Sequence, residues 1–247
     1  MAFDKNSNGF TFGFATVLVV VVGTLLAVTY MGLKPAYDEN VRREKMQNIL
    51  GAMGVEVDRD AAPARYQELV KSAFLVDANG KPVDGDGFAL DVLKQYKAWK
   101  AGEIEAGDMV YPVYEADKEG TKLYVLPVVG TGLWGPIWGY LSVEDDGRTV
   151  HGSLFDHKGE TPGLGAEIAT PMFEDQFPDK TITEADGTYT GIKVYKGGSQ
   201  TTDPHGVDGI SGGTITSDGV DEMLQRTLAV YVDFFQSRNG TNSYSQR

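Results

Sequence analysis

The chain has 247 residues and contains no cysteine, which excludes a disulfide framework, a thiolate metal centre and a cysteine-held iron–sulfur cluster. Basic residues are also scarce, because 22 Lys and Arg stand against 35 Asp and Glu, for a formal net charge of −13. Such a chain has no basic stripe to neutralise phosphates, so we expect no nucleic-acid partner. Three scattered histidines indicate neither a metal site nor a second redox centre.

Charged side chains are missing altogether from residues 10–33. At about 1.5 Å per residue, this run reaches about 36 Å as a helix, which is enough to cross a bilayer once. A cleaved secretory signal is the alternative, but its hydrophobic run is usually only about 7–15 residues long, and here a single lysine, Lys5, precedes the run. We therefore predict a short N-terminal tail, residues 1–9, and a retained transmembrane helix in contact with membrane lipid.

The chain beyond this helix divides into three parts. Val41, Ile49 and other apolar residues recur at helical spacing among charged ones, which predicts a membrane-proximal helix at residues 34–54. Residues 55–236 then form one folded domain, and residues 237–247 form a polar, frayed C-terminal tail. Local charge does not decide on which side of the membrane the domain lies, because long domains translocate largely regardless of such charges.

The domain alternates apolar runs with turn signals, which is typical of antiparallel strands. The predicted strands are residues 109–114, 123–129, 137–143 and 189–195, and the turn signals are Glu119-Gly120, Asp146-Gly147 and Asp186-Gly187. Strands followed by one closing helix predict an α+β fold, in which a mostly antiparallel sheet packs against helices.

The closing helix is predicted at residues 220–235, with Ser217 or Asp218 as its N-cap. Its apolar residues fall on one side, which should cover a face of the sheet. These residues are Val220, Met223, Leu224, Leu228, Tyr231, Phe234 and Phe235.

The segment DGISGGTITS at residues 208–217 combines a carboxylate, glycines and hydroxyls just before this helix. A helix N-terminus favours an anion, so a phosphate near Thr214 could meet the backbone N–H groups of residues 216–218. Gly212 and Gly213 would allow close approach. An ordinary Gly/Ser loop leading to an N-cap fits the same spacing.

Residues 209–213, GISGG, also fit G-x-S-x-G, the nucleophile elbow of serine hydrolases. That elbow requires a buried strand directly before the serine, but residues 200–209 are polar and rich in turn formers, so we expect no strand there. No spacing ties His151, His157 or His205 to Ser211 as a base. A membrane-anchored hydrolase and a cofactor-free binding domain remain alternatives.

The segment resembles the FMN-binding domain family of NqrC and RnfG subunits, whose signature is approximately D-x-x-(S/T)-G-A-T. Asp208, Ser211, Gly212 and Thr214 match this signature, whereas Gly213 stands where alanine is usual. The resemblance implies that FMN is attached to Thr214 through a phosphoester, and that a Mg²⁺-dependent flavin transferase installs it from FAD.

It also implies that the neighbours Ser211, Gly212, Gly213 and Thr216 bind the cofactor. The missing methyl at position 213 makes the loop more mobile and could slow recognition by the transferase.

A second motif, ETPGLGAEI, covers residues 160–168. Its Pro162-Gly163 pair predicts a type II turn, and taken alone it indicates no more than that turn. In the family the corresponding loop lies against the isoalloxazine ring. The resemblance therefore implies flavin contacts from four residues, Glu160, Thr161, Leu164 and Gly165.

A third motif, GTGLWGPIWGY, covers residues 130–140 and resembles NqrC more than RnfG. A flavin ring could stack on one of its two tryptophans, and we place Trp134 beside the ring. The alternative is that Trp134 and Trp138 both fill the core or the sheet surface.

The resemblance carried by these three motifs implies an electron-transfer subunit of a Na⁺-translocating NADH:quinone oxidoreductase, with FMN as cofactor, no catalytic side chain and no metal. The family further implies a complex of six subunits in the bacterial inner membrane, with this domain in the periplasm. Electrons would pass toward the FMN of the B subunit, and the membrane-embedded D and E subunits would be further partners. An RnfG-type electron-transport protein is the alternative.

Overall fold

The computed structural model describes residues 7–197 and 202–245, with side chains described to residue 238. It divides into two units, residues 1–45 and residues 46–247. Each unit is described by itself.

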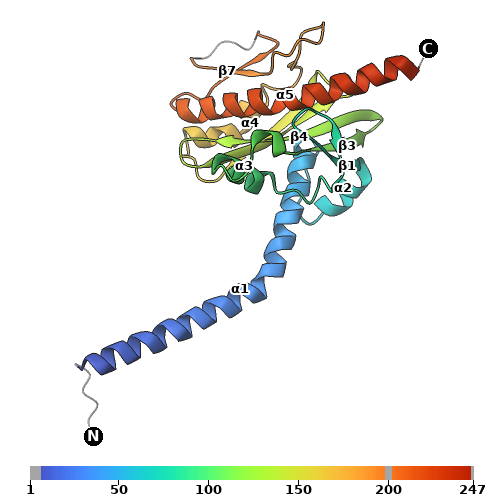
Figure 1. Ribbon diagram of the computed structural model, residues 1–247. Coiled ribbons are helices and arrows are strands. Elements are labelled where there is room, and N and C mark those ends of the chain that lie inside the picture. The colour runs from blue at the N-terminus through green and yellow to red at the C-terminus, as the bar shows by residue number, and fades with distance from the viewer. Residues whose placement is uncertain (1–6, 198–201, 246–247) are drawn as a thin grey trace. The chain divides into compact units, whose positions relative to one another are not determined.

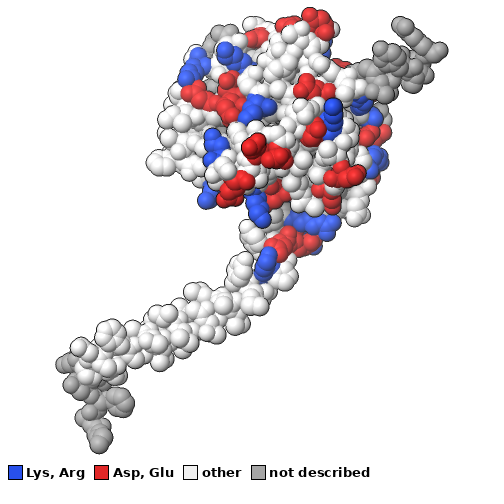
Figure 2. All heavy atoms as spheres, in the orientation of Figure 1, with Lys and Arg blue, Asp and Glu red and all other residues white. Residues whose placement is uncertain are grey.

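The first unit consists of most of α1 (Asn8–Ala52), a single helix that contains Pro35. The two helices expected at residues 10–33 and 34–54 are therefore one continuous helix. Proline removes one backbone hydrogen bond, and the long helical runs on both sides of Pro35 maintain the helix despite that loss. This is the one helix among the described residues that is long and apolar enough to span a membrane, and its apolar stretch buries nothing within the protein. Figure 2 shows this stretch without charged side chains, as suits a membrane anchor.

The last turns of α1 belong to the second unit, where Met46, Ile49 and Leu50 are buried in a core. The helix ends at Ala52, two residues before the predicted end at residue 54, and Gly54 follows in a left-handed conformation with φ of 68°. The Gly54 N–H donates to the carbonyl of Gly51, and the ammonium of Lys118 donates to the Met53 carbonyl at 2.6 Å. These bonds satisfy backbone groups that the helix end leaves free.

The second unit is built on a six-stranded antiparallel sheet in the order β2-β1-β3-β4-β5-β6, with a separate parallel pair, β7-β8 (Figure 1). The strands are β1 (Val70–Val76), β2 (Pro82–Val83), β3 (Tyr111–Lys118), β4 (Thr121–Thr131), β5 (Pro136–Glu144), β6 (Val150–His157), β7 (Lys193–Tyr195) and β8 (Gly206–Asp208). The helices are α2 (Ala62–Leu69), α3 (Val92–Lys100), η1 (Ala106–Asp108), η2 (Gly165–Ala169), α4 (Pro171–Glu174) and α5 (Thr214–Ser245). The predicted α+β class is confirmed.

Successive residues of the central strands face two different cores, because side chains alternate across a strand. On β4, Leu123 and Val125 pack with the end of α1 and with α2, whereas Tyr124 and Leu126 pack with α5. The end of α1 and α2 thus cover one face of the sheet, and α5 covers the opposite face (Figure 1). All seven residues predicted for the apolar side of the closing helix are buried.

Other local predictions differ from the structure. The run at residues 189–195 forms only the short β7, in a parallel pair, and β1, β2, β6 and β8 were not predicted. Helix α5 starts at Thr214, before the expected N-cap residues, and continues to Ser245 through the stretch expected to fray. The serine, asparagine, threonine and glycine residues of this stretch have low helix propensity, so the continuation depends on propagation from a helix that the sheet already supports.

Candidate functional site

Three loops carry the three motifs, and the fold brings them to one end of the sheet. The first is the β4–β5 hairpin loop at residues 132–135, the second follows β6, and the third joins β8 to α5. The pairing of β4, β5 and β6 places the first two loops beside each other. Helix α5 packs on β4, with Gly219 against the Thr131 carbonyl, and this contact brings the third loop to the same place.

The hairpin loop presents Trp134 to solvent with 67% of its surface exposed. The Gly132 N–H closes the loop by donating to the Gly135 carbonyl at 2.8 Å. The indole Nε1 donates to the hydroxyl of Thr161 at 3.1 Å, which fixes one edge of the ring. Trp138 lies half-buried on β5 opposite Asp156. The alternative, in which both tryptophans fill the core or the sheet surface, fits Trp138 on β5 and is wrong for Trp134, which lies exposed in the loop.

The loop after β6 contains the predicted type II turn. Gly163 has φ of 74°, and the Leu164 N–H donates to the Thr161 carbonyl at 3.1 Å. The Gly163 N–H donates to a carboxylate oxygen of Glu167 at 2.8 Å. The turn leaves Leu164 41% exposed, although it is an apolar residue.

Glu160 is the acidic residue of the second motif that is buried, with only 5% of its surface exposed. Its Oε1 accepts from the backbone N–H of Trp134 at 2.8 Å, and its Oε2 accepts from the hydroxyl of Thr216 at 2.7 Å. Its own N–H donates to Nδ1 of His157 at 3.1 Å. One side chain therefore bonds the hairpin loop to the first turn of α5.

Thr214 is the first residue of α5, and its side chain is exposed. The first helical bond runs from the Ser217 N–H to the Gly213 carbonyl at 2.9 Å. The helix therefore leaves the amides of residues 214–216 for an anion, rather than those of residues 216–218 as expected. Ser217 is buried and accepts from the Ile210 N–H at 2.9 Å, so it does not cap the helix as predicted.

Glycines let these loops approach one another closely. A Cβ at Gly165 would lie 2.6 Å from Oε2 of Glu160, and a Cβ at Gly213 would lie 3.2 Å from the Gly165 N. Gly212 has φ of 75°, and a Cβ there would lie 2.7 Å from a methyl carbon of Leu164. The structure therefore brings together every cofactor-binding residue that the sequence analysis named.

Sequence reasoning missed two residues of this surface, Leu133 and Ile215, which are 49% and 57% exposed. Ile215 lies outside the apolar stripe of its helix, and an apolar residue at such a position indicates an exposed contact surface. Leu133, Trp134, Leu164 and Ile215 are the exposed apolar residues of the three loops and the start of α5, and we call them the apolar rim; Ile215 directly follows the exposed Thr214 in the sequence. A flat apolar ring and a phosphate therefore both find matching groups at these loops.

For the serine-hydrolase alternative, the structure provides the required strand but no histidine base. Contrary to expectation, the short strand β8 precedes the G-x-S-x-G segment, and Ser211 is exposed. The histidine rings are engaged elsewhere, because Nδ1 of His157 accepts from the Glu160 N–H and Nδ1 of His205 lies 2.6 Å from the Thr181 carbonyl oxygen. Within the described part of the chain, no histidine bonds Ser211, as catalysis by a serine requires.

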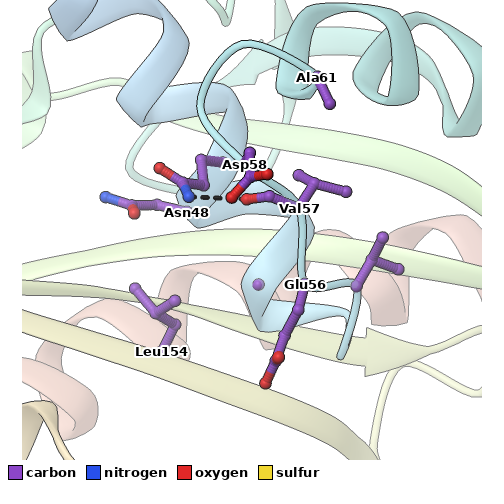
Figure 3. A pocket seen from close by; sticks show the side chains of 9 residues that line it. Asn48, Glu56, Val57, Asp58, Ala61 and Leu154 are labelled. Carbon is purple, nitrogen blue, oxygen red and sulfur yellow. Dashed lines mark hydrogen bonds between the residues drawn. The ribbon is translucent and has the colours of Figure 1, made fainter.

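A separate hollow of about 790 Å³ lies on the sheet face covered by α1 (Figure 3). It is lined by the end of α1, residues 55–61 and Leu154 of β6. The amide of Gln47 bridges part of it by donating to the Val57 carbonyl at 2.7 Å. Within residues 55–61, the lining residues are Val55, Glu56, Val57, Asp58 and Ala61, and the lining brings no nucleophile together with a base, so we assign no chemistry to it.

Comparison with known proteins identifies the family of this chain. The family described as FMN-binding domain matches residues 132–229, which include all three loops. The C subunit of the Na⁺-translocating NADH-quinone reductase from Vibrio anguillarum is 32% identical over 89% of this chain and 90% of its own. Its counterpart from Pasteurella multocida is 34% identical over 90% of both chains.

Solved structures give the same result. The crystal structure of the corresponding protein from Parabacteroides distasonis is 44% identical, covers 82% of this chain and 96% of its own, and superposes with a TM-score of 0.72. Shewanella oneidensis NqrC superposes with a TM-score of 0.65 at 24% identity, which supports the fold alone. This chain belongs to the family of C subunits of the Na⁺-translocating NADH-quinone reductase, an oxidoreductase complex.

Proposed function

We propose that this chain relays electrons within a Na⁺-translocating NADH:quinone reductase through FMN esterified to Thr214. The observation that carries the proposal is the exposed hydroxyl of Thr214 at the first position of α5, beside unbonded helix amides and an apolar rim. Attachment forms a bond between the Thr214 oxygen and the FMN phosphorus of FAD, breaks the bond from that phosphorus to AMP, and releases AMP and the hydroxyl proton.

The protein's part in electron transfer is to hold and shield the cofactor. The amides of residues 214–216 would bind the phosphate, which the helix dipole also favours. Trp134 and Leu164 would provide apolar walls that keep water from the ring. When bound, FMN supplies reversible electron transfer, and no side-chain acid or base is required.

The family also supports specific partners and a location. Electrons would pass to the FMN of the B subunit, with the D and E subunits in the surrounding membrane and a flavin transferase acting during maturation. We place α1 across the bacterial inner membrane and the domain in the periplasm, where a tethered cofactor cannot be lost by dilution. A mature N-terminus near Val28 or Thr29, found by sequencing the membrane-bound protein, would contradict the retained anchor.

The sharpest test of the proposal is Thr214→Ala, which should abolish covalent flavin because a phosphoester requires a hydroxyl at the acceptor. Ser211→Ala and Thr216→Ala are matched controls that should retain at least some flavin, and Thr214→Ser, which keeps the acceptor oxygen, should be partly modified. Each variant is expressed in the membrane with the flavin transferase, digested with protease, and searched by mass spectrometry for the peptide with the added FMN mass. FMN mapped to Ser211 or Thr216 would refute the assignment.

A further inference from the structure

We propose that Glu160 acts as a positioning residue of the flavin site. Its carboxylate fixes the distance between Trp134 and the helix turn that bears Thr214. The inference rests on the proposed attachment of FMN to Thr214. It gives Glu160 a role other than the flavin contact expected from the sequence. Because Glu160 is 5% exposed, it has little surface left for a ligand.

The first support is that the two carboxylate oxygens of Glu160 accept hydrogen bonds from two different parts of the site. Oε1 accepts from the Trp134 N–H at 2.8 Å, and Oε2 accepts from the Thr216 hydroxyl at 2.7 Å. Thr216 lies two residues after Thr214, in the same first turn of α5. The wall of the ring site and the ester site therefore both depend on one rigid carboxylate group.

The second support is the confinement of that carboxylate between two glycines. A Cβ at Gly132 would lie 2.7 Å from Oε1, and a Cβ at Gly165 would lie 2.6 Å from Oε2. Backbone therefore closes on each oxygen, and the group has little room to change its rotamer. Such confinement makes Glu160 a fixed spacer rather than a mobile surface charge.

The third support is that little else holds Trp134 in place. Its side chain is 67% exposed, and the one hydrogen bond of its indole goes to the Thr161 hydroxyl at 3.1 Å. Packing therefore contributes little to the indole position, and the bond from Glu160 to the Trp134 backbone contributes much. Loss of this bond should let the hairpin loop move away from α5.

Flavin fluorescence tests the proposal, because an indole in contact with the ring quenches flavin emission by electron transfer. In the full chain with FMN on Thr214, Glu160→Ala should raise flavin emission several-fold, nearly as much as Trp134→Phe does. In the Trp134→Phe background, Glu160→Ala should add almost nothing, because the two residues act through the same contact. Glu160→Gln should retain quenching, since its amide can accept from Trp134 and donate to Thr216.

Two matched variants keep this result specific. Thr216→Val removes only the Oε2 bond and should raise the emission by an intermediate amount. Glu174→Ala removes a half-buried carboxylate that accepts from the Phe155 N–H at 2.6 Å outside the three loops, and it should leave the emission unchanged. Wild-type emission in Glu160→Ala, or an equal rise with and without Trp134, would overturn the proposal.

Amide hydrogen exchange separates this proposal from the flavin assignment. In the Thr214→Ala chain, which should lack flavin, the peptide spanning residues 131–138 should exchange at least about 5-fold faster when Glu160 is also replaced by alanine. The Glu160→Gln variant should exchange at the parent rate. Unchanged exchange in the alanine variant would reject the positioning role of Glu160, even if mass spectrometry places FMN on Thr214.

A wild-type chain that carries no flavin would instead reject the proposed attachment to Thr214.

Discussion

Tyr231 and Trp134 are large aromatic residues of the same domain, and their surroundings differ in kind. Tyr231 is fully buried on α5, and its hydroxyl lies 3.0 Å and 3.1 Å from the carbonyl oxygens of Pro112 and Pro127. Trp134 is 67% exposed on a hairpin loop. The first residue joins α5 to two strands, whereas the second leaves its surface open for a ligand. Stability and cofactor binding are thus assigned to different regions, the sheet core and the three loops.

The largest expected effect on stability comes from Tyr231→Ala. It leaves a cavity between α5 and the sheet, and it should lower the free energy of unfolding by about 3–5 kcal/mol. Tyr231→Phe keeps the ring and should cost only about 0.5–1.5 kcal/mol, through the lost hydroxyl. Trp134→Ala, the comparison from the loops, should stay within about 0.5 kcal/mol of wild type.

These differences can be measured by thermal unfolding of the full chain in detergent, followed by near-ultraviolet circular dichroism. Losses of equal size for Tyr231→Ala and Trp134→Ala would contradict the separation of core and loops.

The sequence predicts the sheet core better than it predicts the edges of its elements. The apolar stripe of α5 repeats every three or four residues, and apolar runs bounded by turn signals mark β4 and β5, so local patterns find all three elements. β6 was missed because its sequence, VHGSLFDH, has mixed polarity, and its pairing with β5 stabilises it from outside. The start of α5 was misplaced because Thr214 and Ile215 have no apolar pattern that would announce a helix.

The site shows a similar division. Motifs and family resemblance identified the three loops, and the fold confirms that these loops meet. Spacing could not reveal that Glu160 is buried, because the contact that buries it, with Thr216, joins residues 56 positions apart in the sequence. Local sequence carries no information about such a contact unless the pairing of the strands is already known.

Gly219→Ala tests the contact between α5 and the start of the hairpin loop, and it should have the next largest effect on stability. In an ordinary helix this change would stabilise by about 1 kcal/mol. Here the added Cβ would overlap the Thr131 carbonyl oxygen and approach Cα of Gly132 to 3.4 Å. We therefore expect a loss of about 1–3 kcal/mol, together with displacement of the hairpin loop.

The matched control for this change is Gly32→Ala in α1, where a Cβ meets nothing within 4 Å. It should be neutral or slightly stabilising in the same thermal unfolding measurement. A stabilising Gly219→Ala would show that α5 does not press on β4 as closely as the structure indicates.

The smallest expected effect is that of Gly213→Ala, which restores the alanine usual in the family signature. A Cβ at position 213 would lie 3.1 Å from Cβ and Cγ2 of Ile210 and 3.2 Å from the Gly165 N, so neighbouring atoms must shift by a few tenths of an ångström. The cost of this shift opposes the stabilisation of about 0.4–1 kcal/mol that alanine gives by lowering the conformational entropy of the unfolded chain. We therefore expect a net destabilisation below about 1 kcal/mol.

Attachment of flavin should respond differently, because a less mobile loop presents the Thr214 hydroxyl to the transferase more often. The initial rate of FMN incorporation should be equal to or faster than that of wild type. Gly212→Ala is the adjacent control, since φ of 75° and a Cβ 2.7 Å from a Leu164 methyl carbon make that position strained. It should cost more stability and slow incorporation, because the strain displaces the loop that carries the acceptor. The opposite result, in which Gly213→Ala blocks incorporation and Gly212→Ala does not, would contradict this explanation. It would show that the close approach of Gly212 to Leu164 does not position the acceptor hydroxyl.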